Sequence, residues 1–261
     1  MIILKTVLNT SVFLMLTALS QVGGVAYLAA VLGPKLSHWR RAGVFVAAYA
    51  ALWIASMVVA PWFGRVPVSC GLQETPHLEM QSPLYCALNR HYVTPELRQI
   101  ALDLASHVNA RHPDTTTIVL DGSFPFFDGF PLLPHLSHDD GQKLDFAFYY
   151  SKDGRTKSPI GYWAFEDPDQ GDRQPCTGLA KVGMRWDMEW FAVFHNDLEF
   201  DEARTRTALH WLASEGSARG VGKVFVEPHL VDRLGLSGNV IRFQGCRAAR
   251  HDDHIHIQLA R

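Results

Sequence analysis

Two long stretches of apolar, uncharged residues open the chain, at positions 7–32 and 42–64. Each is long enough to cross a hydrocarbon core of about 30 Å, which takes roughly 20 apolar residues. We therefore predict a membrane anchor of two transmembrane helices over residues 1–64, in contact with the lipid bilayer through 7–32 and 42–64. A cleaved signal peptide is the alternative for the first stretch, but that stretch exceeds a typical signal-peptide core and a second one follows it.

After the anchor, apolar residues alternate with polar ones in short stretches, which is the pattern of strands with two different faces. In residues 144–150 every second residue is apolar, and Asp145 faces away from that side. In residues 254–260 every second residue is aliphatic, so His254 and His256 share the opposite face. Both stretches are predicted to be strands that carry polar side chains on one face only.

Helical periodicity appears between these strands. Thr94 is followed by proline and glutamate, a helix-starting pattern, and apolar residues then recur at helical spacing (Leu97, Ile100, Ala101, Leu104, Ala105 and Val108). Residues 201–219 predict a second helix, and 116–121 and 223–227 predict two more strands. This set of elements indicates the α+β class, with a small antiparallel sheet flanked by helices.

Charge and composition divide the chain further. Four of the 24 basic residues and none of the 26 acidic residues lie in 1–64, so the remainder carries 20 basic and 26 acidic residues. No basic cluster favours nucleic acid as a partner. Residues 65–90 hold three prolines and little periodicity, which predicts a linker and a loop leading into the domain. Residues 91–261 are predicted to form the folded domain.

The basic residues also predict how the anchor is oriented. The short connection at 34–41 carries three of them, so the positive-inside rule places it in the cytoplasm. With two spans, both the N-terminus and everything after residue 65 would then lie outside. Lys5 and Arg65 argue against this orientation because they would lie on the outer side.

All four cysteines follow the anchor, and their even number predicts two disulfides in an oxidising compartment. We prefer the pairs Cys70–Cys86 and Cys176–Cys246, although four cysteines allow three pairings. A zinc site built from cysteines is the competing interpretation. The absence of a C-x-x-C motif from the sequence speaks against it.

The histidines supply the candidate chemistry. His138 and Asp145 lie seven residues apart, and Gly141 lets the loop between them turn sharply. Three further histidines fall within residues 251–256, where His256 is predicted to face the same side as Asp145. A catalytic zinc ion needs three N or O ligands and one open position for water. His138, Asp145 and His256 could provide those three ligands.

These motifs resemble those of a known group of enzymes. H-x-x-G-x-x-x-D at 138–145, followed far downstream by H-x-H at 254–256, is similar to the zinc peptidases grouped with lysostaphin, the D-Ala-D-Ala peptidases and the hedgehog fold. Ser137 before the first histidine and the H-x-x-H-x-H form at 251–256 look most like the penicillin-insensitive murein endopeptidases. The resemblance covers roughly residues 116–259, although its motifs occupy few positions.

The resemblance implies a division of roles. It makes His138, Asp145 and His256 the ligands of one Zn²⁺ ion. It places His254 and His251 as the catalytic side chains beside that ion. Relatives with an acidic base carry Glu three residues before the last ligand, where this chain has Asp253. On a straight strand Asp253 points away from His256, so we expect His254 to act on the water or the transition state, unless a bulge reverses the direction.

Location and resemblance together suggest a substrate. We expect a membrane-anchored, zinc-dependent peptidoglycan endopeptidase that hydrolyses amide bonds in cross-linked stem peptides. It would lie in the bacterial inner membrane with its domain in the periplasm. The nearest alternative is a carboxypeptidase or dipeptidase that trims D-Ala termini. A zinc-bearing but inactive cell-wall binding module, as occurs in the hedgehog branch, is an alternative of another class.

Three segments are candidates for contact with a substrate: a loop, an aromatic stretch predicted as a strand entering a helix, and a basic stretch. Residues 122–136 are rich in Phe, Pro and Gly, and form either a wall of the substrate groove or plain packing over the sheet. The aromatic stretch 186–194 is similar to segments near the cleft of murein endopeptidases. The basic stretch 242–250 would either hold the carboxylates of an acidic peptide or be a solvated loop.

Overall fold

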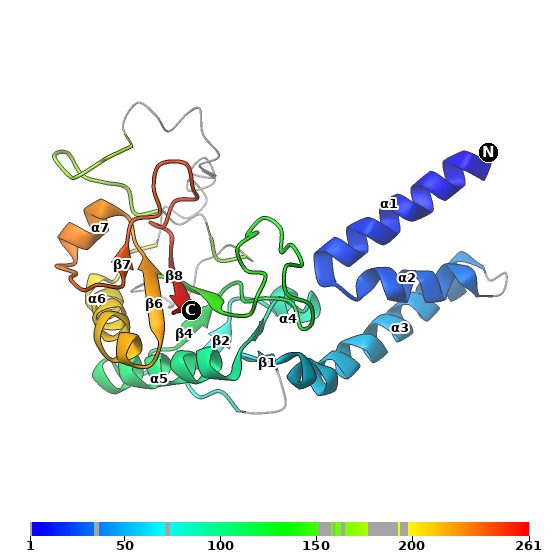
Figure 1. The fold of residues 1–261 in the computed structure, drawn as a ribbon, viewed down its shortest axis with the longest axis horizontal. Helices are drawn as coiled ribbons and strands as arrows, with labels where there is room; N and C mark the ends of the chain where they lie inside the picture. The colour runs from blue at the N-terminus through cyan, green and yellow to red at the C-terminus, as the bar shows by residue number, and fades with distance from the viewer. Residues whose placement is uncertain are drawn as a thin grey trace.

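The computed structural model describes residues 2–33, 37–70, 74–150, 158, 160–162, 165–176, 193 and 198–260. These residues form apolar helices at the N-terminal end and a mixed α+β domain at the other (Figure 1). The predicted α+β class is therefore confirmed, and so is the presence of apolar helices before the domain.

The N-terminal helices are α1 (Ile2–Ser20), α2 (Gly23–Leu32) and α3 (His38–Val59), and α3 continues into the 3₁₀ turn η1 (Ala60–Phe63). Ile3–Ser20 and His38–Phe63 are long and apolar enough to cross a membrane, and only 6% of each is buried inside the protein. The first of them, near the N-terminus, also fits a signal sequence. Side chains so apolar and so little covered are suited to a lipid environment.

The prediction of one span over residues 7–32 is wrong, because the chain turns back within that stretch. Helix α1 ends at Ser20, and Gln21 adopts a left-handed conformation with φ 64°. Helix α2 then packs closely on α1: a Cβ at Gly24 would lie 1.9 Å from Thr17 Oγ1. With 10 residues, α2 is only about 15 Å long, too short to cross a membrane.

This turn also bears on where the N-terminus lies relative to the domain. The first residues of α1 and the start of α3 both lie at the end far from the domain, whereas the turn between α1 and α2 lies next to it (Figure 1). The start of α1, which includes Lys5, therefore lies at the same end as the start of α3, which includes Arg40 and Arg41.

Among the described residues, six strands form the main sheet in the order β2-β4-β5-β8-β6-β7. These strands are β2 (Leu78–Met80), β4 (Thr117–Val119), β5 (Lys143–Ala147), β8 (His254–Leu259), β6 (Val221–Phe225) and β7 (Ile241–Arg242). The four strands predicted from alternation and β-branching are thus confirmed, with somewhat different ends. The pairs β2–β4 and β6–β7 are parallel, so the sheet is mixed and not wholly antiparallel as predicted.

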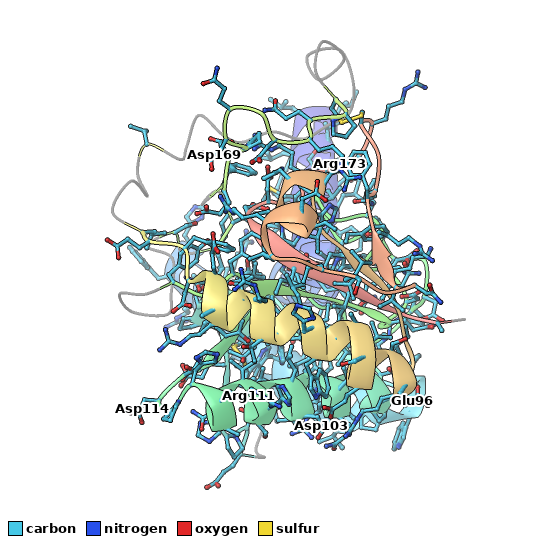
Figure 2. The ribbon with its side chains drawn as sticks, turned by 90° about the vertical axis from the view of Figure 1, so that its left-hand side faces the viewer. Glu96, Asp103, Arg111, Asp114, Asp169 and Arg173 are labelled. Carbon is cyan, nitrogen blue, oxygen red and sulfur yellow. A yellow bond between two sulfur atoms is a disulfide. The ribbon has the colours of Figure 1, made fainter. Side chains whose placement is uncertain are left out.

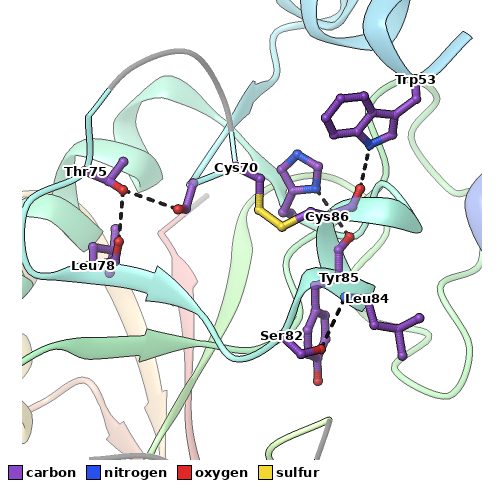
Figure 3. Close-up of a disulfide and its surroundings, with 10 residues drawn as sticks. Trp53, Cys70, Thr75, Leu78, Ser82, Leu84, Tyr85 and Cys86 are labelled. Carbon is purple, nitrogen blue, oxygen red and sulfur yellow. Dashed lines mark hydrogen bonds between the residues drawn. A yellow bond between two sulfur atoms is a disulfide. The ribbon is translucent and has the colours of Figure 1, made fainter. Parts of the chain in front are cut away.

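Residues 65–90, predicted as a linker, contribute elements of the domain. β1 (Val66–Pro67) pairs with β3 (Tyr92–Val93), β2 forms an edge of the main sheet, and α4 (Pro83–Ala87) follows. Cys70 and Cys86 form a disulfide across this segment, and the Cys86 carbonyl accepts a hydrogen bond of 2.7 Å from Trp53 Nε1 of α3 (Figure 3). The segment therefore joins the apolar helix α3 to the sheet.

One face of the sheet is covered by α5 (Pro95–Arg111) and α6 (Glu202–Trp211), the latter continued by the π-helical turn η3 (Leu212–Gly216). All six apolar residues predicted for the first of these helices are buried, and Thr94 caps it through a bond to the Leu97 amide. Charged side chains such as Glu96 and Arg111 lie on its outer side (Figure 2). Each fully buried leucine or isoleucine contributes about 1.5–3 kcal/mol, so this interface holds the domain together.

Both preferred disulfide pairings are confirmed. Cys70 pairs with Cys86, and Cys176 pairs with Cys246, with Cα atoms 5.9 and 5.4 Å apart. The second bond joins positions 70 residues apart and ties the loop after residue 165 to the segment that leads into β8. Two disulfides of this kind are typical of an oxidising compartment.

Candidate metal centre

The register between β5 and β8 sets two candidate ligands side by side. Asp145 lies directly opposite His256, and Ala147 lies opposite His254. The neighbouring residues Phe146 and Ile255 also face each other, but point into the core and are fully buried. Because successive strand residues point to opposite faces, the apolar packing on one face fixes the polar side chains on the other.

A loop brings the third candidate to the same place. His138 is 1% exposed, and its Nε2 atom lies 3.2 Å from His256 Nδ1 and 3.3 Å from Asp145 Oδ1. The loop turns at Gly141, whose φ of 74° favours glycine. Ser123 Oγ donates to the His138 carbonyl at 2.8 Å and accepts from the Gly141 amide at 3.1 Å. The sequence-predicted triad of His138, Asp145 and His256 is therefore brought together.

The spacing of these atoms fits a metal ion. In a tetrahedral zinc site with bonds of about 2.0–2.1 Å, neighbouring ligand atoms lie roughly 3.3 Å apart. Two of the three distances have this value, and the third, between His256 Nδ1 and Asp145 Oδ1, is a hydrogen bond of 2.7 Å. Two imidazoles and one carboxylate are also a donor set that zinc accepts. The residues present can therefore hold a metal ion.

Hydrogen bonds from neighbouring groups orient these candidate ligands. His138 Nδ1 lies 2.9 Å from the Gly122 carbonyl, which can only accept, so this nitrogen donates and the Nε2 lone pair faces the site. Tyr162 Oη donates to Asp145 Oδ2 at 2.6 Å and leaves Oδ1 for the site. Contacts of this type hold metal ligands in place in many proteins.

The electrostatics of the site favour the metal-binding forms of Asp145 and His256. For His138, burial lowers the pKa of the ring, but the adjacent Asp145 carboxylate outweighs burial and raises it. Burial raises the pKa of the Asp145 carboxyl, but the nearby His138 and His254 rings outweigh it and hold that pKa well below its usual range. Burial lowers the pKa of His256 to about 4, although Asp145 opposes this shift. A carboxylate and a neutral imidazole, both needed for metal binding, are thus present at neutral pH.

His254 lies beside the triad and is oriented by Asp253. Its Nε2 atom is 3.9 Å from Asp145 Oδ1, and its Nδ1 donates to Asp253 Oδ1 at 2.5 Å. Burial lowers the pKa of His254, but the Asp253 and Asp145 carboxylates outweigh burial and raise it to about 9. Sequence reasoning considered Asp253 only in relation to His256 and missed its contact with the adjacent histidine.

His251 lies on the other side of His254, with ring centroids 4.8 Å apart. Its Nδ1 atom is buried and has no hydrogen-bond partner among the described residues. Burial holds its pKa well below the usual value, so the ring is neutral. His251, His254 and His256 form a second group able to hold a metal ion, and it shares His256 with the first. The first group includes Asp145 and so carries the negative charge that a cation favours.

A buried ion pair behind the site escaped sequence reasoning. Arg90 donates Nε and Nη2 to the two oxygens of Asp121, at 2.6 and 2.8 Å. His135 Nδ1 lies 2.8 Å from Asp121 Oδ2 and 3.7 Å from Asp145 Oδ2. Asp121 lies two residues after β4, so a charged residue shortly after a core strand was the available signal. Nothing in the sequence pattern indicated Arg90 or Tyr162.

A pocket of about 250 Å³ opens beside this centre. The side chains that line it include both polar and apolar groups. The ionisable ones include His135, His254, Asp253, Asp121, Arg90 and Arg250, and the apolar ones include Leu84, Leu88, Leu133, Ile160 and Phe165. In the loop 122–136, Leu133 lines the pocket, while Phe124 and Leu132 are buried. The role of this loop as a wall of a substrate groove stays a prediction. The aromatic stretch 186–194 lies, apart from Val193, outside the described residues.

The chain matches no family model and no curated protein sequence. The chain folds into a mixed α+β domain, and this domain carries a buried group of histidines and aspartates able to hold a metal ion.

Proposed function

We propose that this protein is a membrane-anchored zinc peptidase that hydrolyses amide bonds in cross-linked peptidoglycan stem peptides. One observation carries the proposal: His138, Asp145 and His256 present three donor atoms to one point, with His254 beside them at the wall of a pocket. The resemblance of the same residues to the motifs of murein endopeptidases supports the substrate class. The disulfides and the apolar helices support a site outside the cytoplasm, facing the cell wall.

The residues divide the chemistry between binding and proton transfer. A zinc ion held by His138, Asp145 and His256 would supply an acidic bound water and polarise the scissile carbonyl. His254 Nε2 lies on the same side of the sheet as the three ligands. There it can exchange a proton with the bound water or donate a hydrogen bond to the developing oxyanion. Asp253 fixes the ring of His254 through Nδ1. Tyr162 keeps Asp145 in its ligand orientation.

The charges around the pocket favour an endopeptidase over a carboxypeptidase. A carboxypeptidase needs a cation for the terminal carboxylate of its substrate. The cations in the described lining of the pocket are Arg90, Arg250 and the protonated ring of His254, which is paired with Asp253. Arg90 is paired with Asp121, and Arg250 with Asp252 and Asp167. Arg250, the last residue of the basic stretch 242–250, is thus paired with acidic residues of the protein itself.

The test uses the full-length protein, expressed with its disulfides and purified in detergent micelles. It is incubated with peptidoglycan sacculi, with and without a chelator, and the released fragments are identified by mass. We expect chelator-sensitive loss of cross-linked dimers. His254→Ala should lower the rate about 10²–10⁴-fold, the usual effect of removing a general acid or base, and should retain zinc. His210→Ala, at an exposed position on α6, is the matched control.

The other outcomes separate the alternatives. Release of terminal D-Ala alone would identify a carboxypeptidase. Intact sacculi in the presence of stoichiometric zinc would contradict the peptidase proposal and favour a zinc-bearing binding module. Unchanged activity in His254→Ala would remove the role given to that side chain.

A further inference from the structure

Arg65 is a buried cation at the junction between the apolar helices and the domain. It follows Gly64, directly after η1, and its amide donates to the Ala60 carbonyl at 3.1 Å. At this position an arginine would ordinarily be solvated, but Arg65 is only 1% exposed. A buried guanidinium has to be balanced by several acceptors, so its partners show what it holds.

Those partners lie at the two ends of the loop that carries His138. Arg65 Nη1 donates to the Phe124 carbonyl at 2.5 Å, and Nη2 donates to the Asp139 carbonyl at 3.3 Å. Nη2 also pairs with Asp128, within the loop. The side chain therefore joins the beginning and the end of residues 124–139, next to the candidate ligand.

The loop also packs against the stem of Arg65. A Cβ at Gly141 would lie 2.9 Å from Arg65 Nε and 3.2 Å from its Cδ. The Gly141 carbonyl in turn accepts from the Thr94 amide at 2.9 Å. The turn between His138 and Asp145 is thus shaped around the Arg65 side chain.

Two other residues of the apolar helices contact the same loop. The Phe63 ring packs edge-on against Phe126 and Phe127, with centroids 5.2 and 5.5 Å apart. Gln21 Oε1, at the turn between α1 and α2, accepts from the Phe126 amide at 3.1 Å. Figure 1 shows this loop, in green, between the domain and the turn that joins the two helices.

We propose that Arg65 is a positioning residue through which the apolar helices hold the loop of residues 124–139, the His138 loop, in its metal-binding conformation. Within residues 124–139 the backbone is held by isolated hydrogen bonds, such as that from the Gly129 amide to the Asp139 carbonyl, and not by a strand ladder. The position of His138 therefore also relies on side-chain bonds from elsewhere. The N-terminal helices are then a part of the metal centre and not only a tether. This inference rests on the metal centre of the proposed function, but not on the identity of the substrate.

The test measures metal binding in the full-length protein in detergent micelles. Zinc affinity is determined by competition with a chromophoric chelator for wild type, Arg65→Gln and Arg65→Lys. We expect Arg65→Gln to weaken zinc binding about 10–100-fold, as for other residues that orient ligands, and to alter the absorption spectrum of the cobalt(II)-loaded protein. Arg65→Lys keeps the charge and can reach one carbonyl, so it should restore part of both. Arg219→Gln, which loses a half-exposed pair with Asp103, is the control.

Wild-type zinc affinity and an unchanged cobalt spectrum in folded Arg65→Gln would overturn the inference. If Arg65→Gln does not fold, Phe63→Ala decides, since it removes only an aromatic contact with the loop. A smaller loss of zinc affinity in Phe63→Ala supports the inference, and wild-type affinity overturns it. Zinc affinity and the cobalt spectrum do not depend on hydrolysis. Sacculi that stay intact would therefore contradict the proposed function, but would leave the effect of Arg65 on metal binding unchanged.

Discussion

The candidate metal centre is built from two regions that hold their candidate ligands by different means. Asp145 and His256 lie opposite each other on β5 and β8, so the backbone ladder that supports the core also sets their spacing. His138 lies on a loop, where single contacts from Ser123 and Arg65 hold its backbone. Strand ligands are therefore placed by the general stability of the sheet. The loop ligand depends on a few hydrogen bonds that a point mutation can remove.

The two regions also differ in how they can fail. If one hydrogen bond between β5 and β8 is lost, the neighbouring bonds still hold the two strands in register, because the strands are paired over five consecutive residue positions. The loop has fewer such supports, and they come from residues distant in the sequence. Ligand orientation in the loop should therefore be lost before the domain unfolds.

The largest expected effect tests whether the metal joins the two regions at all. Asp145→Ala and His138→Ala should each lower zinc affinity by more than about 100-fold, beyond the range for residues that only orient ligands. Both measurements use chelator competition, with Asp103→Ala on α5 as the control. If both variants bind zinc like wild type while His251→Ala does not, the metal is held by His251, His254 and His256, and the loop plays no part.

A pH prediction probes the segment that supports the loop. His91 is fully buried, and burial lowers its pKa from 6.5 to about 4. The folded state thus favours the neutral ring, so its stabilising effect is complete above pH 6.5 and is lost as the pH falls towards 4. We expect a loss of about 2 kcal/mol at pH 5 relative to pH 8. Urea unfolding of metal-free wild type and His91→Phe at both pH values measures it.

This pH effect bears on the loop because the neighbours of His91 hold its first residues. The Tyr92 amide donates to the Ser123 carbonyl, the Ser123 amide donates back, and the Gly122 amide donates to the Arg90 carbonyl. A smaller loss of stability at pH 5 in His91→Phe would confirm the assignment. An equal loss in both proteins would show that other groups cause the acid sensitivity.

The smallest expected effect concerns the loop alone. Ser123→Ala removes the bonds to the His138 carbonyl and from the Gly141 amide, while β5 and β8 keep their pairing. We expect zinc affinity to fall about tenfold, or roughly 1.4 kcal/mol. Ser214→Ala, an exposed serine that bonds within its own helix, is the control. Equal zinc affinity in both variants would mean that the loop is held without Ser123, against the comparison drawn above.

Local patterns predicted the strand region well. Alternation identified β5 and β8 and placed Asp145 and His256 on the same face, since side-chain direction in a strand follows from position. The capping pattern at Thr94 and the apolar spacing after it predicted α5 and its buried face. The preferred pairing of the cysteines was also correct.

The contacts around the loop could not be predicted in this way. Arg65 lies 74 residues before Asp139, and Arg90 lies 31 residues before Asp121. Tyr162 reaches Asp145 from a segment without clear periodicity. These side chains meet because of the path of the chain, for which a single sequence carries no local signal. The break of the first apolar stretch at Gln21 was missed because hydropathy does not register a left-handed residue.

The sequence by itself determined the local elements of this protein: apolar helices, the two ligand-bearing stretches, and which residues of each share a face. Periodicity is sufficient there because strand and helix geometry repeats along the chain. Only the tertiary structure decided that α1 and α2 turn back beside the domain, that Asp253 orients His254, and that Arg65 closes the His138 loop. Those arrangements depend on burial and on hydrogen bonds between distant residues, and these are set when the whole chain packs together.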